Sequence, residues 1–138
     1  MKTFKEFITE ANYTNKQIAD MANKADAALD KTYGYGRVKG GVSPIPGRNK
    51  QKGFGAVANF NSAKEALVAA GRAKGNVRTV SNAVHKGWGK TVNQMPAPEP
   101  KQSARKKLRD TPYFKLSKDE QEKDDVISRT VMKVRKKK

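Results

Sequence analysis

Positive charge is concentrated in the middle of this 138-residue chain, and that limits what the chain can fold into. Residues 31–109 contain 17 Lys and Arg but only two acidic residues, and the whole chain has a formal net charge of +17. Like charges repel one another and oppose compaction. Hydrophobic residues make up 36% of the chain, below the roughly 45–50% of globular domains. We therefore expect short helices joined by disordered segments rather than one large core.

Composition also excludes several classes of function. The chain has no cysteine and a single histidine, His85, which excludes disulfides, thiolate zinc sites and a histidine metal cluster within one chain. No apolar run approaches the roughly 20 residues of a membrane span, and we expect none. The acidic residues at 119–125 fall at a Lys-rich helix start and are interpreted as capping and solubility. We expect no enzyme and no cofactor, but a protein whose charge suits a polyanion.

Apolar spacing and capping patterns predict helices at four places. The expected helices span residues 14–30, 62–74, 77–93 and 117–134. Three of them start with a capping-box pattern, namely Thr14 with Gln17, Ser62 with Glu65, and Ser117 with Glu120. The fold class that follows is mainly α.

Two segments rich in glycine or proline separate these helices. Residues 33–61 are Gly-rich and basic, and residues 94–104 contain three prolines, so both are predicted to be flexible linkers. The predicted organisation is a helical segment at 11–32, the linker at 33–61, and a small helical domain at 62–138. The second linker interrupts that domain, and the chain is expected to be partly disordered.

The first eleven residues, MKTFKEFITEA, place Phe4, Phe7 and Ile8 at helical spacing. A helix over residues 2–10 would be amphipathic but too short to be stable alone. The segment resembles the capsid-targeting propeptide of internal head proteins in T-even-type tailed phages. The resemblance implies that Phe4, Phe7 and Ile8 dock to the prohead scaffold. It also implies that the prohead protease reads Ile8 and Glu10 and cuts before Ala11.

The same resemblance implies a protein of the virion interior that passes through the host cytoplasm before assembly. A polycation in a DNA-filled capsid would bind double-stranded DNA nonspecifically, because it neutralises phosphates and releases counterions. Residues expected to contact phosphates are Arg37, Lys39, Arg48, Lys50, Lys52, Arg72, Lys74, Arg78, Lys86 and Lys90.

The segment NAVHKGW at 82–88 and the segment TPYFKLSKDEQEKDD at 111–125 carry a second resemblance. Together they resemble a shortened ryanodine-receptor-type repeat, although the Pro-rich linker replaces the usual glycine-aromatic stretch and an Asp-Asp pair replaces Asp-Arg. The motif residues are His85, Trp88, Pro112, Tyr113 and Leu116. The resemblance implies a binding module, made in the infected cell, for a host protein or a nucleotide-like ligand. On physical grounds the aromatic residues and Leu116 would pack on Ile127 and Val131.

A helix-turn-helix regulator is the second alternative. The TVSNAV sequence at 79–84 resembles the start of a recognition helix, which would lie in the major groove. In that arrangement Arg78, Ser81, Asn82 and Lys86 would face the bases.

Overall fold

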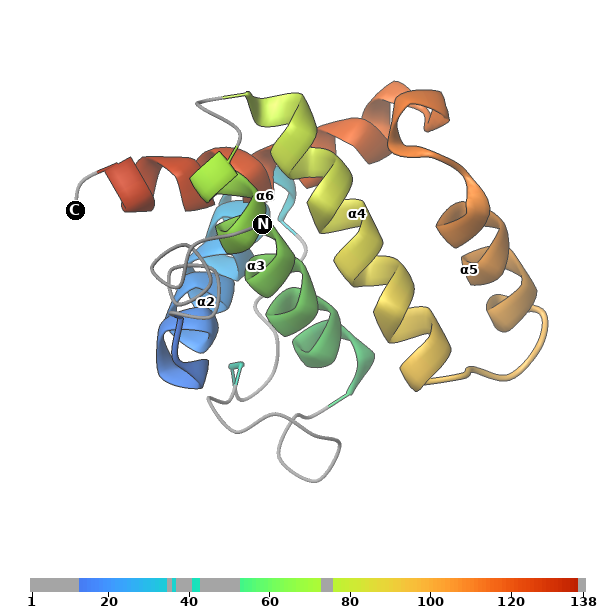
Figure 1. Ribbon diagram of the computed structural model, residues 1–138. Coiled ribbons are helices and arrows are strands. Elements are labelled where there is room, and N and C mark those ends of the chain that lie inside the picture. The colour runs from blue at the N-terminus through green and yellow to red at the C-terminus, as the bar shows by residue number, and fades with distance from the viewer. Residues whose placement is uncertain (1–12, 35, 37–40, 43–52, 73–75, 137–138) are drawn as a thin grey trace, which may run out of the picture.

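The computed structural model describes residues 13–34, 36, 41–42, 53–72 and 76–136, and this part of the chain is mainly helical (Figure 1). The elements in order are α2 (Asn15–Tyr33), α3 (Phe54–Arg72), α4 (Val77–Gln94), α5 (Lys101–Asp110), the short 3-10 helix η1 (Tyr113–Lys115) and α6 (Lys118–Lys136). None of the helices in the described ranges has the length and apolar character needed to cross a membrane.

The helix predicted from residue 14 is confirmed as α2. The Thr14 hydroxyl accepts a hydrogen bond from the Gln17 backbone N–H at 3.1 Å, and the Gln17 side chain accepts one from the Thr14 N–H at 2.9 Å. The helix runs to Tyr33 and ends at Gly34, whose φ of 71° places it in the left-handed region. Glycine enters this region without steric cost.

Side chains from α2, α3, α4 and α6 share one hydrophobic core, which corrects the expectation that the chain has none of this kind. Its members include the fully buried Ala22, Ala63, Ala66, Val80 and Val131. Small side chains allow helices to approach closely, so a chain with few large apolar residues still buries a continuous interior. In Figure 1, α3 and α4 lie side by side and run in opposite directions.

Helix α3 begins earlier than predicted, so residues 54–61 of the predicted linker are helical. Ser62, predicted as a cap, lies in the middle of α3 and is 3% exposed. Its hydroxyl donates to the Val84 carbonyl at 3.2 Å. Burial of Phe60 and its neighbouring alanines outweighs the cost of the glycines before them.

Val42 is a second residue of the predicted linker that belongs to the core. The Asn23 side chain donates to the Val42 carbonyl at 3.1 Å and accepts from the Val42 N–H at 2.8 Å. This paired contact holds the chain against α2 and leaves Val42 5% exposed.

The remaining predicted helices and the second linker have mixed outcomes. Helices α4 and α6 confirm the predictions at 77–93 and 117–134, and the Ser117 hydroxyl accepts from the Glu120 N–H at 3.2 Å. The predicted linker at 94–104 is only partly non-helical, because α5 begins at Lys101. Proline is tolerated where a helix starts, since the N–H it lacks has no partner there.

Candidate functional site

A pocket of about 430 Å³ lies between α3, α4, α5 and α6. Its apolar lining includes Ala58, Val84 and Ile127, and polar side chains from α4, α5 and α6 complete it. Ligand pockets commonly combine an apolar wall with a few placed polar groups. This arrangement makes the pocket the candidate functional site.

Three rings form the aromatic side of the pocket. The Phe54 and Trp88 ring centroids lie 6.1 Å apart with planes at 77°. The His85 and Trp88 rings lie 6.2 Å apart and nearly parallel at 10°, because residues three apart on a helix share a face. The Arg105 guanidinium from α5 lies 3.8 Å from the centroid of the Phe54 ring, at a distance typical of cation–π contact.

The hydrogen bond of His85 determines which of its nitrogens carries the proton. Nε2 lies 2.8 Å from the Thr111 carbonyl oxygen. A carbonyl only accepts, so the Nε2–H donates and Nδ1 of the neutral ring is an acceptor. Nδ1 lies 4.0 Å from Asp124 Oδ2, which is too far for a hydrogen bond.

Among the acidic side chains of the described residues, Asp124 has the largest shift in pKa. Its side chain is 15% exposed. Burial, followed by the nearby negative charges of Glu120 and Asp125, raises the pKa of Asp124 to about 8. The carboxyl group is therefore mostly protonated at neutral pH when the pocket is empty.

This shift makes stability depend on pH. The folded-state pKa of Asp124 lies above the unfolded value, so the folded state loses stability as pH rises from about 4 to 8. We expect Asp124→Asn to raise the free energy of unfolding at pH 8 by more than about 2 kcal/mol and to leave it nearly unchanged at pH 4. Urea unfolding at the two pH values measures this. The exposed Asp119→Asn on the same helix is the control, and an equal gain in both variants would contradict the expectation.

The neighbouring Asp125 holds a buried polar network together. Its Oδ1 accepts hydrogen bonds from the Ser81 and Tyr113 hydroxyls, both at 2.6 Å. The hydroxyls of Ser81 and Ser128 lie 2.8 Å apart. Burial, together with the hydrogen bond to Asp125, raises the pKa of Tyr113 to about 12. The network connects η1 to α4 and α6 and so holds together elements that surround the pocket. Its own residues do not line the pocket.

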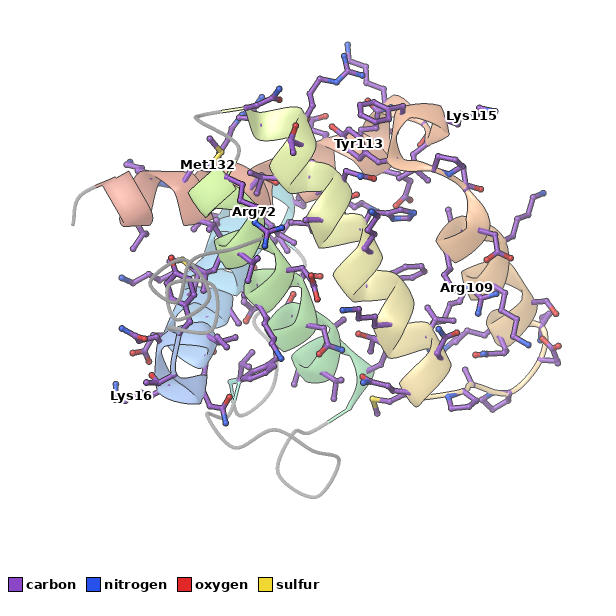
Figure 2. All side chains as sticks on the ribbon, in the orientation of Figure 1. Lys16, Arg72, Arg109, Tyr113, Lys115 and Met132 are labelled. Carbon is purple, nitrogen blue, oxygen red and sulfur yellow. The ribbon has the colours of Figure 1, made fainter. Side chains whose placement is uncertain are left out.

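The structure brings together some of the residues on which the ryanodine-type resemblance rests. His85, Trp88 and Leu116 line the pocket, whereas Tyr113 is buried in the adjacent network and Pro112 is exposed. In Figure 2, Tyr113 lies where the chain passes from α5 to α6.

Sequence reasoning did not assign most of the lining residues to a site, including the aromatic and charged Phe54, Arg105 and Asp124. Phe54 follows a glycine in the predicted linker, and Arg105 follows the Pro-rich segment. Asp124 was interpreted as capping. Its place three residues before the core residue Ile127 is the one signal that could have indicated burial.

The predicted DNA-contacting residues are only partly described. Arg72, Arg78, Lys86 and Lys90 are exposed, and the Lys90 ammonium pairs with Glu65. Arg37, Lys39, Arg48, Lys50, Lys52 and Lys74, as well as the docking and cleavage residues at 1–11, lie outside the described residues. Helix α5 adds exposed Lys101, Lys106 and Lys107, which the prediction left out although residues 101–109 contain no acidic residue.

The residues predicted for the recognition helix do not share one exposed face. Ser81 is fully buried and is hydrogen-bonded to Asp125, so its predicted contact with bases is corrected. The antiparallel course of α3 and α4 also differs from a helix-turn-helix, in which the helices cross at about 90–120°.

The described part of the chain is mainly helical and holds an aromatic-walled pocket, and the whole chain is strongly basic. No protein-family model, no curated protein and no solved structure matches this chain.

Proposed function

We propose that this protein is an internal head protein of a phage virion. In this proposal its N-terminus directs it to the prohead scaffold, the prohead protease cuts after Glu10, and the basic mature form binds packaged DNA nonspecifically. The observation that supports DNA binding most directly is the charge on α5. That helix has five basic residues and one acidic residue, Asp110.

Helix α5 packs mainly against α4, so much of its surface faces solvent. Lys101, Lys106 and Lys107 are exposed on it; we call these three residues the basic surface. Arg109 instead contacts Asp110 at 2.8 Å and is labelled on α5 in Figure 2. Exposed lysines suit phosphate contacts, which give affinity without reading the base sequence.

Neutralising part of the basic surface should weaken the salt dependence of DNA binding. Each lost phosphate contact lowers the slope of log K against log salt by about 0.9. We expect the double variant Lys106→Gln/Lys107→Gln to lower that slope by about 2, equally for unrelated duplexes. Fluorescence anisotropy with labelled DNA across a salt series measures it.

The matched control is Lys16→Gln/Lys24→Gln on α2, which lies on the other side of the molecule from α5 in Figure 1. Both control lysines are exposed, and the control removes the same charge. An equal loss of slope in the two double variants would mean that α5 is not the contact surface.

Intact-mass spectrometry of purified particles of the encoding phage tests the head-protein proposal. A chain starting at Ala11 is the expected result. Full-length chain in the particles would retain the virion role and overturn the cleavage. Absence from particles, with abundance in infected cells, would overturn the role itself.

A binding module is the second candidate function, and the pocket is the observation that favours it. Such a module would bind a host protein or a small ligand in the infected cell and would retain its N-terminal residues. Saturable binding that is insensitive to salt would distinguish it from a DNA-associated polycation.

A further inference from the structure

We propose that the pocket binds a small organic cation, a primary amine with an apolar body, whose ammonium group is held by Asp124 and His85. This inference concerns a site separate from the basic surface and does not depend on DNA binding. It rests on three observations: the hydrogen-bond acceptor atoms of His85 and Asp124 face one another, the nearby Arg and Lys side chains already have partners, and the rest of the pocket lining is apolar.

Once Asp124 is ionised, its Oδ2 and the Nδ1 of His85 are two acceptor atoms that face one another without a donor between them. Because Nε2 donates to Thr111, Nδ1 of neutral His85 has a free lone pair, and it lies 4.0 Å from Asp124 Oδ2. Among the described residues no side chain donates a hydrogen bond to the Asp124 carboxyl group within hydrogen-bond distance. An ammonium group has three N–H donors and can donate to both atoms at once.

The cations that line the pocket already have partners. The Arg105 guanidinium lies over the Phe54 ring at 3.8 Å, and the Lys123 ammonium lies 3.4 Å from Glu120 Oε1. Asp124 has no Lys or Arg ion pair among the described residues, and the attraction of Lys123 offsets only part of the burial and of the acidic neighbours that raise its pKa. When Asp124 ionises, a buried carboxylate without a close partner costs free energy. A ligand that carries positive charge would offset that cost.

The rest of the pocket suits an apolar body of modest size. Ala58, Leu116 and Ile127 supply aliphatic surface, and Trp88 supplies an aromatic face. A cation beside an aromatic ring gains further stabilisation. The volume of about 430 Å³ accommodates an amine of the size of phenethylamine.

Trp88 provides the assay, because it is the only tryptophan of the chain and it lines the pocket. We would titrate the full chain with phenethylamine, 2-phenylethanol and 3-phenylpropionate, which differ mainly in the charge of the polar end. Saturable change in Trp88 fluorescence with the amine is expected, with at least tenfold weaker binding of the other two. No amine binding at millimolar concentrations, or a carboxylate that binds as tightly, would overturn the proposal.

Asp124→Asn should weaken amine binding at least tenfold and leave the binding of the alcohol unchanged. The control Asp119→Asn removes an exposed carboxylate from the same helix and should bind the amine like the unaltered chain. A thermal melt verifies that both variants fold. Equal amine affinity in the two variants would contradict a pairing with Asp124.

The pH dependence provides a second test that needs no variant. The titratable and charged groups that surround Asp124 are His85 of α4, Arg105 of α5, and Glu120, Lys123 and Asp125 of α6. The lining residues of α3 do not titrate. Since a proton must leave Asp124 before the amine binds, the affinity for the amine should fall about tenfold per pH unit from pH 7 to 5. Constant affinity across that range would overturn the proposal.

Discussion

Gly87→Ala is expected to lower the free energy of unfolding by about 2 kcal/mol. A Cβ atom at residue 87 would lie 2.7 Å from the Asn61 carbonyl oxygen and 2.8 Å from Ser62 Cα. These are backbone atoms of α3, so relief requires α3 and α4 to separate at the core. Overpacking of this kind costs about 1–3 kcal/mol and occasionally more, which exceeds the gain of about 1 kcal/mol from better helix propensity.

Gly89→Ala is the matched control on the same helix. Its Cβ atom would meet Arg109 Cγ at 2.9 Å, so the Arg109 side chain must rotate and give up its exposed hydrogen bonds to Asn93 and Asp110, while the backbone stays in place. The gain of about 1 kcal/mol in helix propensity should offset this cost and leave the variant nearly neutral. Urea unfolding of both variants measures the contrast, and similar destabilisation of the two would disprove the close approach of α3 to α4.

Tyr113→Ala is expected to cost about 3–5 kcal/mol, the largest effect that we predict. Tyr113 is 1% exposed and is the largest fully buried side chain in the described part of the chain. Its hydroxyl donates to Asp125 at 2.6 Å, so the truncation opens a cavity and also removes a donor from a half-buried carboxylate. Thermal and urea unfolding measure the loss.

Two further variants separate the contribution of the buried Tyr113 ring from those of its hydroxyl and of the neighbouring Phe114 ring. Phe114→Ala changes the neighbouring ring, which is 57% exposed, and should cost less than about 1 kcal/mol because that ring faces solvent and the guanidinium of Arg78. Tyr113→Phe keeps the buried ring and should cost about 1–2 kcal/mol for the lost hydrogen bond. A larger loss in Phe114→Ala than in Tyr113→Ala would show that η1 is turned the other way.

The elements that were predicted well depend on local interactions. Thr14 and Ser117 cap their helices through residues three positions away, and the capping pattern is visible in the sequence itself. The apolar spacing of α4 is likewise local. Local rules therefore located three of the five helices in the described residues to within a few positions.

The errors in the predicted start of α3 and in the predicted linker have a different cause. The same capping pattern occurs at Ser62 and Glu65, yet Ser62 lies inside α3, where its hydroxyl donates to Val84 on another helix and does not cap. Residues 54–61 are glycine-containing and looked flexible, but Phe60 is buried against the core. Contacts between segments that are distant in the chain decided both outcomes, and they outweigh weak local preferences.

The candidate site also combines residues that the local sequence pattern grouped with residues that only tertiary contacts bring together. The resemblance at residues 82–125 grouped His85, Trp88, Pro112, Tyr113 and Leu116. Of these, His85, Trp88 and Leu116 line the pocket, whereas Tyr113 lies in the adjacent network and Pro112 is exposed. Phe54, Arg105 and Asp124 come from three other helices, and neither their spacing nor their type indicated that they would meet.

The sequence by itself determined the helical class, the strong positive charge and the starts of the capped helices, because composition and capping act within a few residues. Only the tertiary structure decided that small side chains build a common core, that Tyr113 is buried while Phe114 is exposed, and that Asp124 faces a pocket. The physical reason is that burial depends on which surfaces meet. An acid at the start of a helix is solvated until another helix covers it.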